Sequence, residues 1–549
     1  MVIEFSILFL NFLAFYTVIY FLGRSVSFSY IISNKEATES KALKVGSKEV
    51  GLELFYPIIG LFILGNLAVL LNFFIPLKNT IFISIILFII LVFNFKNKFD
   101  IIELKNLSLS LLVYPFLLIS TFSASFSYDA GLYHLNNQLW LRESNIIFGF
   151  SNIYGPFGVS SIYEYLSALL WIDGSFIFLH LLNIIFIGVF FNFLINCFNT
   201  NNESFLKKSS VLVLMYSVLD NFGYEGGRNG FLYIQSVGNL DVAVAVVLYI
   251  NSMLIINSIL NKDLNPNDLK IFSILSLFII QMKISSFPIV IIFLIYLFKY
   301  FKYFGFKSLF KQIFFPIFLF LFWIIKSLIQ TGCIIFPFSP LCFKSLSWVD
   351  YNYLKATEEV SISFSTSYVF GSNFSVWLDN YFEIPINKTV FINFLLSIGF
   401  IILLNIFNFK LPKNNESNYI LLIYLVFSLL FYLIFGPDVR YLIGLQIFII
   451  GNLAIFIKKP TFSNKIIIAM LFLISVISIP RLQSYNPESY NDFPYIELPE
   501  YSNTKLFDRN YPSEGDQCWI DIECSANKLD YNIEQRKYFK FVTINYNEV

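Results

Sequence analysis

Long apolar runs separated by short polar segments recur along the chain between residues 5 and 480. A run of roughly 20 apolar residues is long enough to cross the hydrocarbon core of a bilayer as a helix. The first run, residues 5–23, is long for a signal peptide and has no small-residue cleavage site, so we expect it to remain as a membrane span. The pattern therefore predicts an all-α polytopic membrane protein.

Composition agrees with this class, because 57% of the residues are hydrophobic and only 13% are charged. The mean hydropathy of the chain is +0.70. The net charge of +1 gives no reason to expect a nucleic-acid partner.

The placement of the lysines and arginines predicts a topology, because they gather in alternate loops that the positive-inside rule assigns to the cytoplasm. Threading the apolar runs between these loops gives about 12 to 14 crossings with both termini outside, with residues 271–281 and 284–298 taken as two short spans. The positive loops are residues 24–48, 96–105, 207–208, 262–270, 299–311, 410–413 and 458–465. The outer segments are then residues 125–173, 220–239, 331–388, 436–440 and the tail after residue 480.

Four of the five cysteines fall in these outer segments, which agrees with disulfides in an oxidising compartment. The local pairing joins Cys333 to Cys342 and Cys518 to Cys524, while other connectivities and unpaired thiols stay open. No cysteine or histidine spacing typical of a structural zinc site is present.

The stretch SYDAGLYHLNNQLWLRESNI, residues 127–146, is polar enough to suggest a function. A period of 3.6 residues predicts a helix with one polar and aromatic face beside a stripe of leucines, which suits a site at a membrane surface. His134 lies away from Asp129 on this helix, so we interpret His134 as a supporting group rather than a catalyst. The polar face consists of Asp129, Tyr133, Asn136, Trp140 and Glu143.

Charged residues gather at the predicted outer ends of the spans, where a carboxylate can act as a general base and cations can hold a phosphate. An unpaired lysine at membrane depth is costly, so Lys283 is expected to have a phosphate or a carboxylate such as Asp241 as its partner. Arg440, at a helix entrance, could hold a leaving phosphate. Arg228, in EGGRNG, could bind phosphate or anchor at lipid headgroups.

The segment SYDAGLYH, directly after an apolar span, resembles the start of the first outer loop of GT-C glycosyltransferases, which use polyprenyl-phosphate sugars. More narrowly, the chain resembles a little-characterised group of bacterial multi-pass membrane proteins. The segments that carry this likeness are YDAGLYHLNNQLW, MKISSFP, KSLIQTGCIIFPFSPLCF, GPDVRY and GDQCWIDIEC.

The GT-C resemblance implies that Asp129 is the catalytic base of an inverting transfer of sugar from a polyprenyl phosphate to an envelope glycan or lipid. It implies a GT-C-like core at residues 107–480 with an amphipathic outer loop at 125–173. Residues 1–106 would be a transmembrane addition and residues 481–549 a small extracytoplasmic tail. The protein is then expected in the bacterial inner membrane, with its active face extracytoplasmic.

Site roles follow from this interpretation. Arg228, Lys283 and Arg440 would bind the donor phosphate, and an acceptor-binding or supporting set would lie nearby. No metal site is assigned, although a divalent ion stays open if Asp129, Glu143 and Asp438 come together as oxygen ligands. The acceptor-binding or supporting set is Tyr133, His134, Trp140, Arg142 and Glu143.

Other interpretations stay open at this point. Asp129 could instead cap a helix start by accepting backbone N–H groups. The activity could be that of a polymerase or ligase of surface polysaccharide, or of a transporter or flippase of lipid-linked sugars. A transporter should place its charges near the bilayer midplane in matched halves, whereas here most charges fall at the outer edge.

Overall fold

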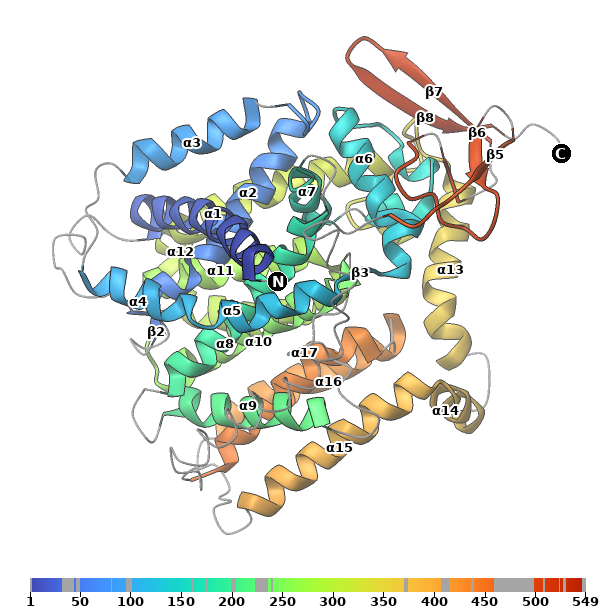
Figure 1. The fold of residues 1–549 in the computed structure, drawn as a ribbon. Helices are drawn as coiled ribbons and strands as arrows, with labels where there is room; N and C mark the ends of the chain where they lie inside the picture. The colour runs from blue at the N-terminus through green and yellow to red at the C-terminus, as the bar shows by residue number, and fades with distance from the viewer. Residues whose placement is uncertain are drawn as a thin grey trace.

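Helices make up most of the computed structural model, and strands occur in its described part only as short two-stranded pairs (Figure 1). The mostly helical class expected from the sequence is confirmed. The structure describes residues 2–31, 44–45, 50–79, 81–94, 101–159, 161–172, 176–198, 204–222, 236–237, 240–369, 374–405, 415–435, 439–458, 498–506, 509–522, 524–526 and 530–545.

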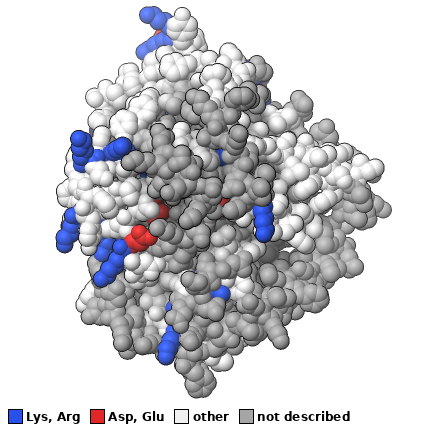
Figure 2. Space-filling model, turned by 90° about the vertical axis from the view of Figure 1, so that its left-hand side faces the viewer, with Lys and Arg blue, Asp and Glu red and all other residues white. Residues whose placement is uncertain are grey.

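Within these residues, 7 helices are long and apolar enough to cross a membrane, which agrees with a polytopic membrane protein. The described surface in Figure 2 is mostly uncharged, with lysines and arginines at separate positions. The 7 candidate spans include α1 (Val2–Val26), α2 (Tyr56–Asn72), α8 (Ile177–Phe198), α10 (Asp241–Leu260), α12 (Ile289–Thr331), α15 (Pro385–Asn405) and α17 (Val439–Asn452).

The other expected crossings fall on helices that are shorter, interrupted or less apolar, and the apolar run before Pro480 lies outside the described residues. The figure of 12 to 14 crossings therefore stays a prediction. The additional helices are α3 (Ile81–Asn94), α4 (Ile101–Leu111), α5 (Tyr114–Leu118), α9 (Phe205–Phe222), α11 (Pro266–Met282) and α16 (Asn415–Phe435).

The helices α1 and α2 cross with their backbones in close contact. A Cβ atom added to Gly60 would lie 2.0 Å from the carbonyl oxygen of Ile19, and one added to Gly23 would lie 1.9 Å from that of Tyr56. Such a crossing requires glycine on both helices, as in other closely packed membrane helices. Helix α2 also packs against α7 (Ile162–Leu169) and α8, so the expected N-terminal addition shares the helical core, and its boundary at residue 106 stays a prediction.

Three predicted outer segments meet in one layer, which we call the cap and define as the described residues within 125–172, 333–349 and 498–545. In Figure 1 the labelled strands β5 to β8 lie beside α6 (Leu135–Glu143) at one edge of the helical body. Phe148 pairs with Phe541 as an isolated bridge, and their rings stack at 4.4 Å. The Asn152 amide donates to the carbonyl oxygens of Trp348 and Val542, at 2.9 and 2.8 Å.

The described part of the tail consists of two antiparallel hairpins that pack into the cap. It shares hydrophobic contacts and hydrogen bonds with residues 126–153, and its expected place outside the cytoplasm stays a prediction. The hairpins are formed by β5 (Asn503–Leu506) with β6 (Arg509–Pro512) and by β7 (Tyr531–Arg536) with β8 (Phe539–Ile544).

Both disulfides of the local pairing are present, Cys333–Cys342 and Cys518–Cys524. The alternative of unpaired thiols at these positions is wrong. Each disulfide closes a short loop inside the cap. The fifth cysteine, Cys197, is buried in α8.

Helix α12 is broken at Gly305, whose backbone (φ 75°, ψ 171°) is one that glycine adopts readily. The residues just before α12 line the cleft described below, and the Ile329 carbonyl near its end accepts from the Gly149 amide of the cap. Between these ends, the Gln312 carbonyl accepts from the hydroxyl of Tyr30, which lies in the short π-helical segment (Ser27–Ile31) that follows α1. The two halves therefore run in opposite directions, and Gly305 lies within the expected positive loop 299–311.

Candidate functional site

Asp129 lies immediately before a π-helical turn, η4 (Ala130–His134), which continues into α6. Turns of this type occur frequently at functional sites. The Ser127 hydroxyl accepts from the Ala130 amide at 3.2 Å, whereas the Asp129 side chain makes no capping hydrogen bond. The capping interpretation of Asp129 is therefore wrong in this structure, because Ser127 occupies that role.

The predicted polar face of this segment is not present. The π turn changes the register, so a single 3.6-residue period no longer relates Asp129 to the residues of α6. Helix α6 is also buried on several sides between α7 and the tail, including the polar residues Asn136, Asn137 and Gln138. The expectation of one polar face beside an apolar stripe is therefore wrong for this helix, while its place at a membrane surface stays a prediction.

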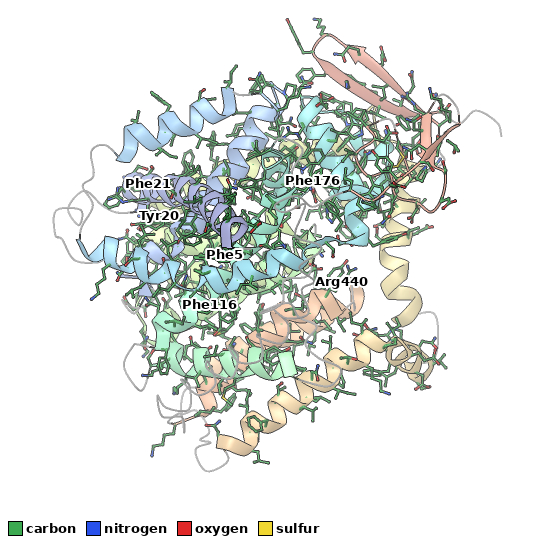
Figure 3. All side chains as sticks on the ribbon, viewed as in Figure 1. Phe5, Tyr20, Phe21, Phe116, Phe176 and Arg440 are labelled. Atoms are coloured by element: carbon green, nitrogen blue, oxygen red, sulfur yellow. A yellow bond between two sulfur atoms is a disulfide. The ribbon has the colours of Figure 1, made fainter. Side chains whose placement is uncertain are left out.

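The Asp129 carboxylate instead pairs with Arg440, which is 311 residues away in the sequence. The Arg440 Nη1 lies 3.4 Å from the Asp129 Oδ2. Arg440 is in the first turn of α17 and is labelled in Figure 3 between that helix and the cap. Both side chains are partly exposed, so the pair lies where a solute or lipid headgroup could reach it.

Arg440 also lines a cleft with Lys283 and Asp241. The Lys283 ammonium pairs with the Asp241 carboxylate and lies 4.1 Å from the centre of the Tyr441 ring. The carboxylate partner expected for Lys283 is thus present. The cleft is small, and the residues around it are Asp241, Val244, Ala245, Leu248, Lys283, Ser285, Ser286, Tyr432, Arg440, Tyr441 and Gly444.

The electrostatics of this cleft suit an anion. Two cations, Lys283 and Arg440, lie at one cleft, each with a carboxylate partner. Helices α10 and α17 also begin there, at Asp241 and Val439, and the N-terminus of a helix carries a partial positive charge and free N–H groups. Asp241 lines the cleft and is only 6% exposed, whereas Asp129 is 31% exposed and is joined to the cleft through its ion pair with Arg440.

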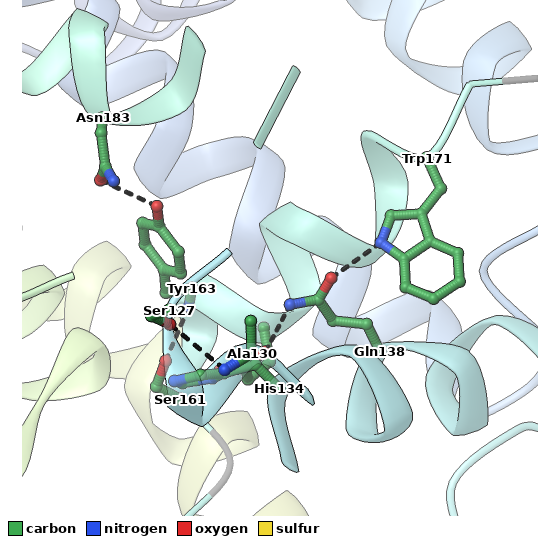
Figure 4. A network of polar contacts seen from close by, with 9 residues as sticks. Ser127, Ala130, His134, Gln138, Ser161, Tyr163, Trp171 and Asn183 are labelled. Carbon is green, nitrogen blue, oxygen red and sulfur yellow. Dashed lines mark hydrogen bonds and ion pairs between the residues drawn. The ribbon is translucent and has the colours of Figure 1, made fainter. Parts of the chain in front are cut away.

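A second polar network lies behind the π turn (Figure 4). His134 Nδ1 contacts Glu164 of α7, and both side chains are buried. Gln138 donates to the same carboxylate at 2.8 Å and accepts from the Trp171 indole at 2.8 Å. This arrangement fits the supporting role expected for His134, because the histidine contacts Glu164 rather than Asp129.

Tyr133 links the network and the cleft. Burial raises the pKa of the Tyr133 hydroxyl well above its ordinary value, and the negative charges of Asp129 and Glu164 raise this pKa further. The phenol therefore stays neutral and can donate a hydrogen bond beside Asp129.

The other predicted site residues have partners elsewhere. Trp140 packs against Phe150 in a separate cluster of the cap. Arg142 donates to the Ala168 carbonyl at 2.6 Å, and Glu143 pairs with Lys78. Arg228 and Asp438 lie outside the described residues.

The described residues contain no group of three or more histidine, cysteine, aspartate or glutamate side chains suited to a metal ion. Of the carboxylates considered as oxygen ligands, Asp129 pairs with Arg440 and Glu143 pairs with Lys78. These two do not form a shared ligand set, so we derive no step through a metal.

Sequence reasoning missed three residues that the structure places at or beside the site: Tyr441, Gln138 and Trp519. Tyr441 follows Arg440 directly, and Gln138 lies one helical turn after His134, a spacing that brings side chains together. Trp519 follows Cys518 in the segment GDQCWIDIEC, where only the disulfide was considered.

Comparison with known proteins identifies a family but no activity. No curated protein and no solved structure shows significant similarity to the chain. A family model described as "Domain of unknown function (DUF8201)" matches residues 6–449, which include Asp129, Asp241, Lys283 and Arg440. This match covers most of the chain, which therefore belongs to the DUF8201 family.

Proposed function

We propose that the protein is an inverting glycosyltransferase that moves a sugar from a polyprenyl phosphate to an acceptor hydroxyl, with Asp129 as general base. The observation that carries this proposal is a cleft lined by two cations, Lys283 and Arg440, of which Arg440 pairs with the partly exposed Asp129 carboxylate. A base for the acceptor and a phosphate-binding group for the donor are the two functions that such a transfer requires. We also propose that residues 107–480 form a GT-C-like core.

The reaction would proceed by one displacement. The acceptor oxygen forms a bond to the anomeric carbon while its proton passes to the Asp129 carboxylate. The bond between the anomeric carbon and the phosphate oxygen breaks, and the lipid phosphate leaves with the electron pair. Lys283 and Arg440 stabilise the charge on this leaving phosphate. The anomeric configuration is inverted because the acceptor attacks opposite the leaving group.

The ion pair between Asp129 and Arg440 has a role in this scheme. Without donor, Arg440 neutralises Asp129 across 3.4 Å. A donor phosphate offers the guanidinium an alternative anion that can accept two parallel hydrogen bonds. Binding of the donor would then release the carboxylate for the acceptor hydroxyl.

The placement of the charges favours transfer over transport. Asp241 begins α10, Lys283 directly follows α11 and Arg440 is in the first turn of α17. All three lie at helix ends on the side of the cap, and not halfway along the helices. A transporter site is expected at the bilayer midplane. A polymerase or ligase of lipid-linked glycans would use the same base and phosphate site with a different acceptor.

The first test concerns the donor phosphate, with undecaprenyl phosphate as the probe. Replacing Arg440 with Gln should weaken its binding about tenfold or more, because a charged hydrogen bond contributes about 1.5–3 kcal/mol. Lys283→Met is best combined with Asp241→Asn, since the nearly buried carboxylate would otherwise lose its partner, and a similar loss of affinity is expected. Binding is measured by titration in detergent.

The matched control is Lys78→Gln, which removes a cation that pairs with Glu143 outside the cleft. This variant should bind the lipid as the wild type does. Undecaprenol, which lacks the phosphate, should bind all proteins equally weakly. Unchanged affinity in both cleft variants would remove Lys283 and Arg440 from the donor site.

The second test concerns the side of the membrane. We propose that the cap faces away from the cytoplasm, because both disulfides lie in it. After mild reduction, an impermeant thiol reagent added to intact cells should label Cys342, the partly exposed cysteine of the Cys333–Cys342 disulfide. Cys197, which is buried in α8, serves as the control and should stay unlabelled. Labelling of the cap cysteines only in broken cells would reverse the topology.

A further inference from the structure

A disulfide-closed loop of the tail lies directly on the segment that carries Asp129. The Trp519 backbone amide donates to the Gly131 carbonyl at 2.9 Å. The Trp519 ring lies against the same glycine, where a Cβ atom would come within 2.6 Å of it. The ring also meets Phe126 edge-on, with 5.6 Å between ring centres. Trp519 therefore contacts the chain on both sides of Asp129.

Two neighbours of Trp519 add to these contacts. The Gln517 amide donates to the Tyr128 carbonyl at 2.9 Å, and the Tyr128 hydroxyl donates to Asp516. The tail thus contacts positions 126, 128 and 131, which bracket Asp129, while the Asp129 carboxylate is paired with Arg440.

The backbone of Trp519 is itself held in an unusual conformation, with φ at 50°. A bulky residue rarely adopts a positive φ, and such strain persists only where the surroundings impose it. Here the Cys518–Cys524 disulfide closes the loop. The Asp521 carboxylate accepts from Asn503 and Asn510 of the tail hairpin, and the Asp521 carbonyl accepts from Asn136 of α6.

We propose that Trp519 is a positioning residue, which holds the π turn so that the Asp129 carboxylate stays beside Arg440. This inference rests on the proposed function for its catalytic consequence. Trp519 lies outside residues 6–449, which the family model matches, so the match to the DUF8201 family says nothing about the tail loop. Misplacement of a catalytic group by about 1 Å can cost about a hundredfold in rate, whereas donor binding depends on Lys283 and Arg440 across the cleft.

Trp519→Ala should therefore lower kcat about tenfold or more while leaving the affinity for undecaprenyl phosphate unchanged. It should also speed hydrogen exchange at the amides of residues 130–135 by about tenfold, because this turn then opens more easily. Trp519→Phe, which keeps a ring against Gly131, should restore most of both properties.

The matched control is Trp348→Ala. Trp348 is another cap tryptophan and contacts the tail through Phe541, away from Asp129. Trp348→Ala should leave the rate of hydrogen exchange at the amides of residues 130–135 as in the wild type. If Trp519→Ala does not accumulate, the double variant Cys518→Ser/Cys524→Ser loosens the same loop and is measured in the same two ways.

The two measurements separate the possible failures. Unchanged exchange in Trp519→Ala, or an equal increase in Trp348→Ala, would overturn the positioning role whatever the activity is. Faster exchange with unchanged turnover would also overturn it, while leaving the proposed glycosyltransferase intact. Full activity in Asp129→Asn would overturn the role of Asp129 as general base. The hydrogen-exchange rates in Trp519→Ala would still decide whether Trp519 holds the π turn.

Discussion

Asp129→Asn is expected to give a folded, membrane-inserted protein that binds undecaprenyl phosphate but transfers sugar at least about a hundredfold more slowly. Asparagine keeps the size of the side chain and an oxygen that can accept from Arg440, but it cannot take the acceptor proton. The helix start should be unaffected, because Ser127 accepts from the Ala130 amide there. Transfer is measured with a lipid-linked sugar, and binding with the lipid phosphate.

Two variants control this experiment. Glu534→Gln removes an exposed carboxylate of the cap that pairs with Arg536, and it should leave the rate unchanged. Asp129→Ala should be as inactive as Asp129→Asn. If Asp129 served only to cap the helix, Asp129→Asn would be active and only Asp129→Ala would lose function. An active Asp129→Asn enzyme would therefore end the general-base proposal.

Gly60→Ala is expected to prevent stable folding. The added Cβ would lie 2.0 Å from the carbonyl oxygen of Ile19, a backbone atom that cannot move aside without separating α1 from α2. Overpacking typically costs about 1–3 kcal/mol even where side chains can adjust, and here only the helices themselves can move. The yield of monodisperse protein and its melting temperature in detergent should both fall sharply.

Gly399→Ala is the matched control for this change. Gly399 is also within an apolar helix, α15, but a Cβ atom there would meet nothing within 4 Å. Alanine is the better helix former, so this variant should be as stable as the wild type or slightly more stable. Normal stability of Gly60→Ala would show that the α1–α2 crossing can open without loss.

The sequence alone predicted the membrane class and favoured the local pairing of the cysteines that the structure has. These properties follow from composition and from contacts that are local along the chain. Apolar runs predict spans whatever their neighbours are, and Cys333–Cys342 and Cys518–Cys524 each join residues fewer than ten positions apart. The expectation that Lys283 needs an anion was of the same kind, because the cost of an unpaired charge does not depend on which partner supplies the anion.

Tertiary structure decided which of the candidate side chains meet. A strict 3.6-residue period placed Trp140 and Glu143 on the same helix face as Asp129, but the π turn and the packing of α6 gave both residues other partners. Nothing local connects Asp129 with Arg440, or Gly131 with Trp519, since several hundred residues separate each pair. Such contacts depend on how the helices and the tail pack together. Local patterns in a single sequence do not show which distant segments will pack against each other.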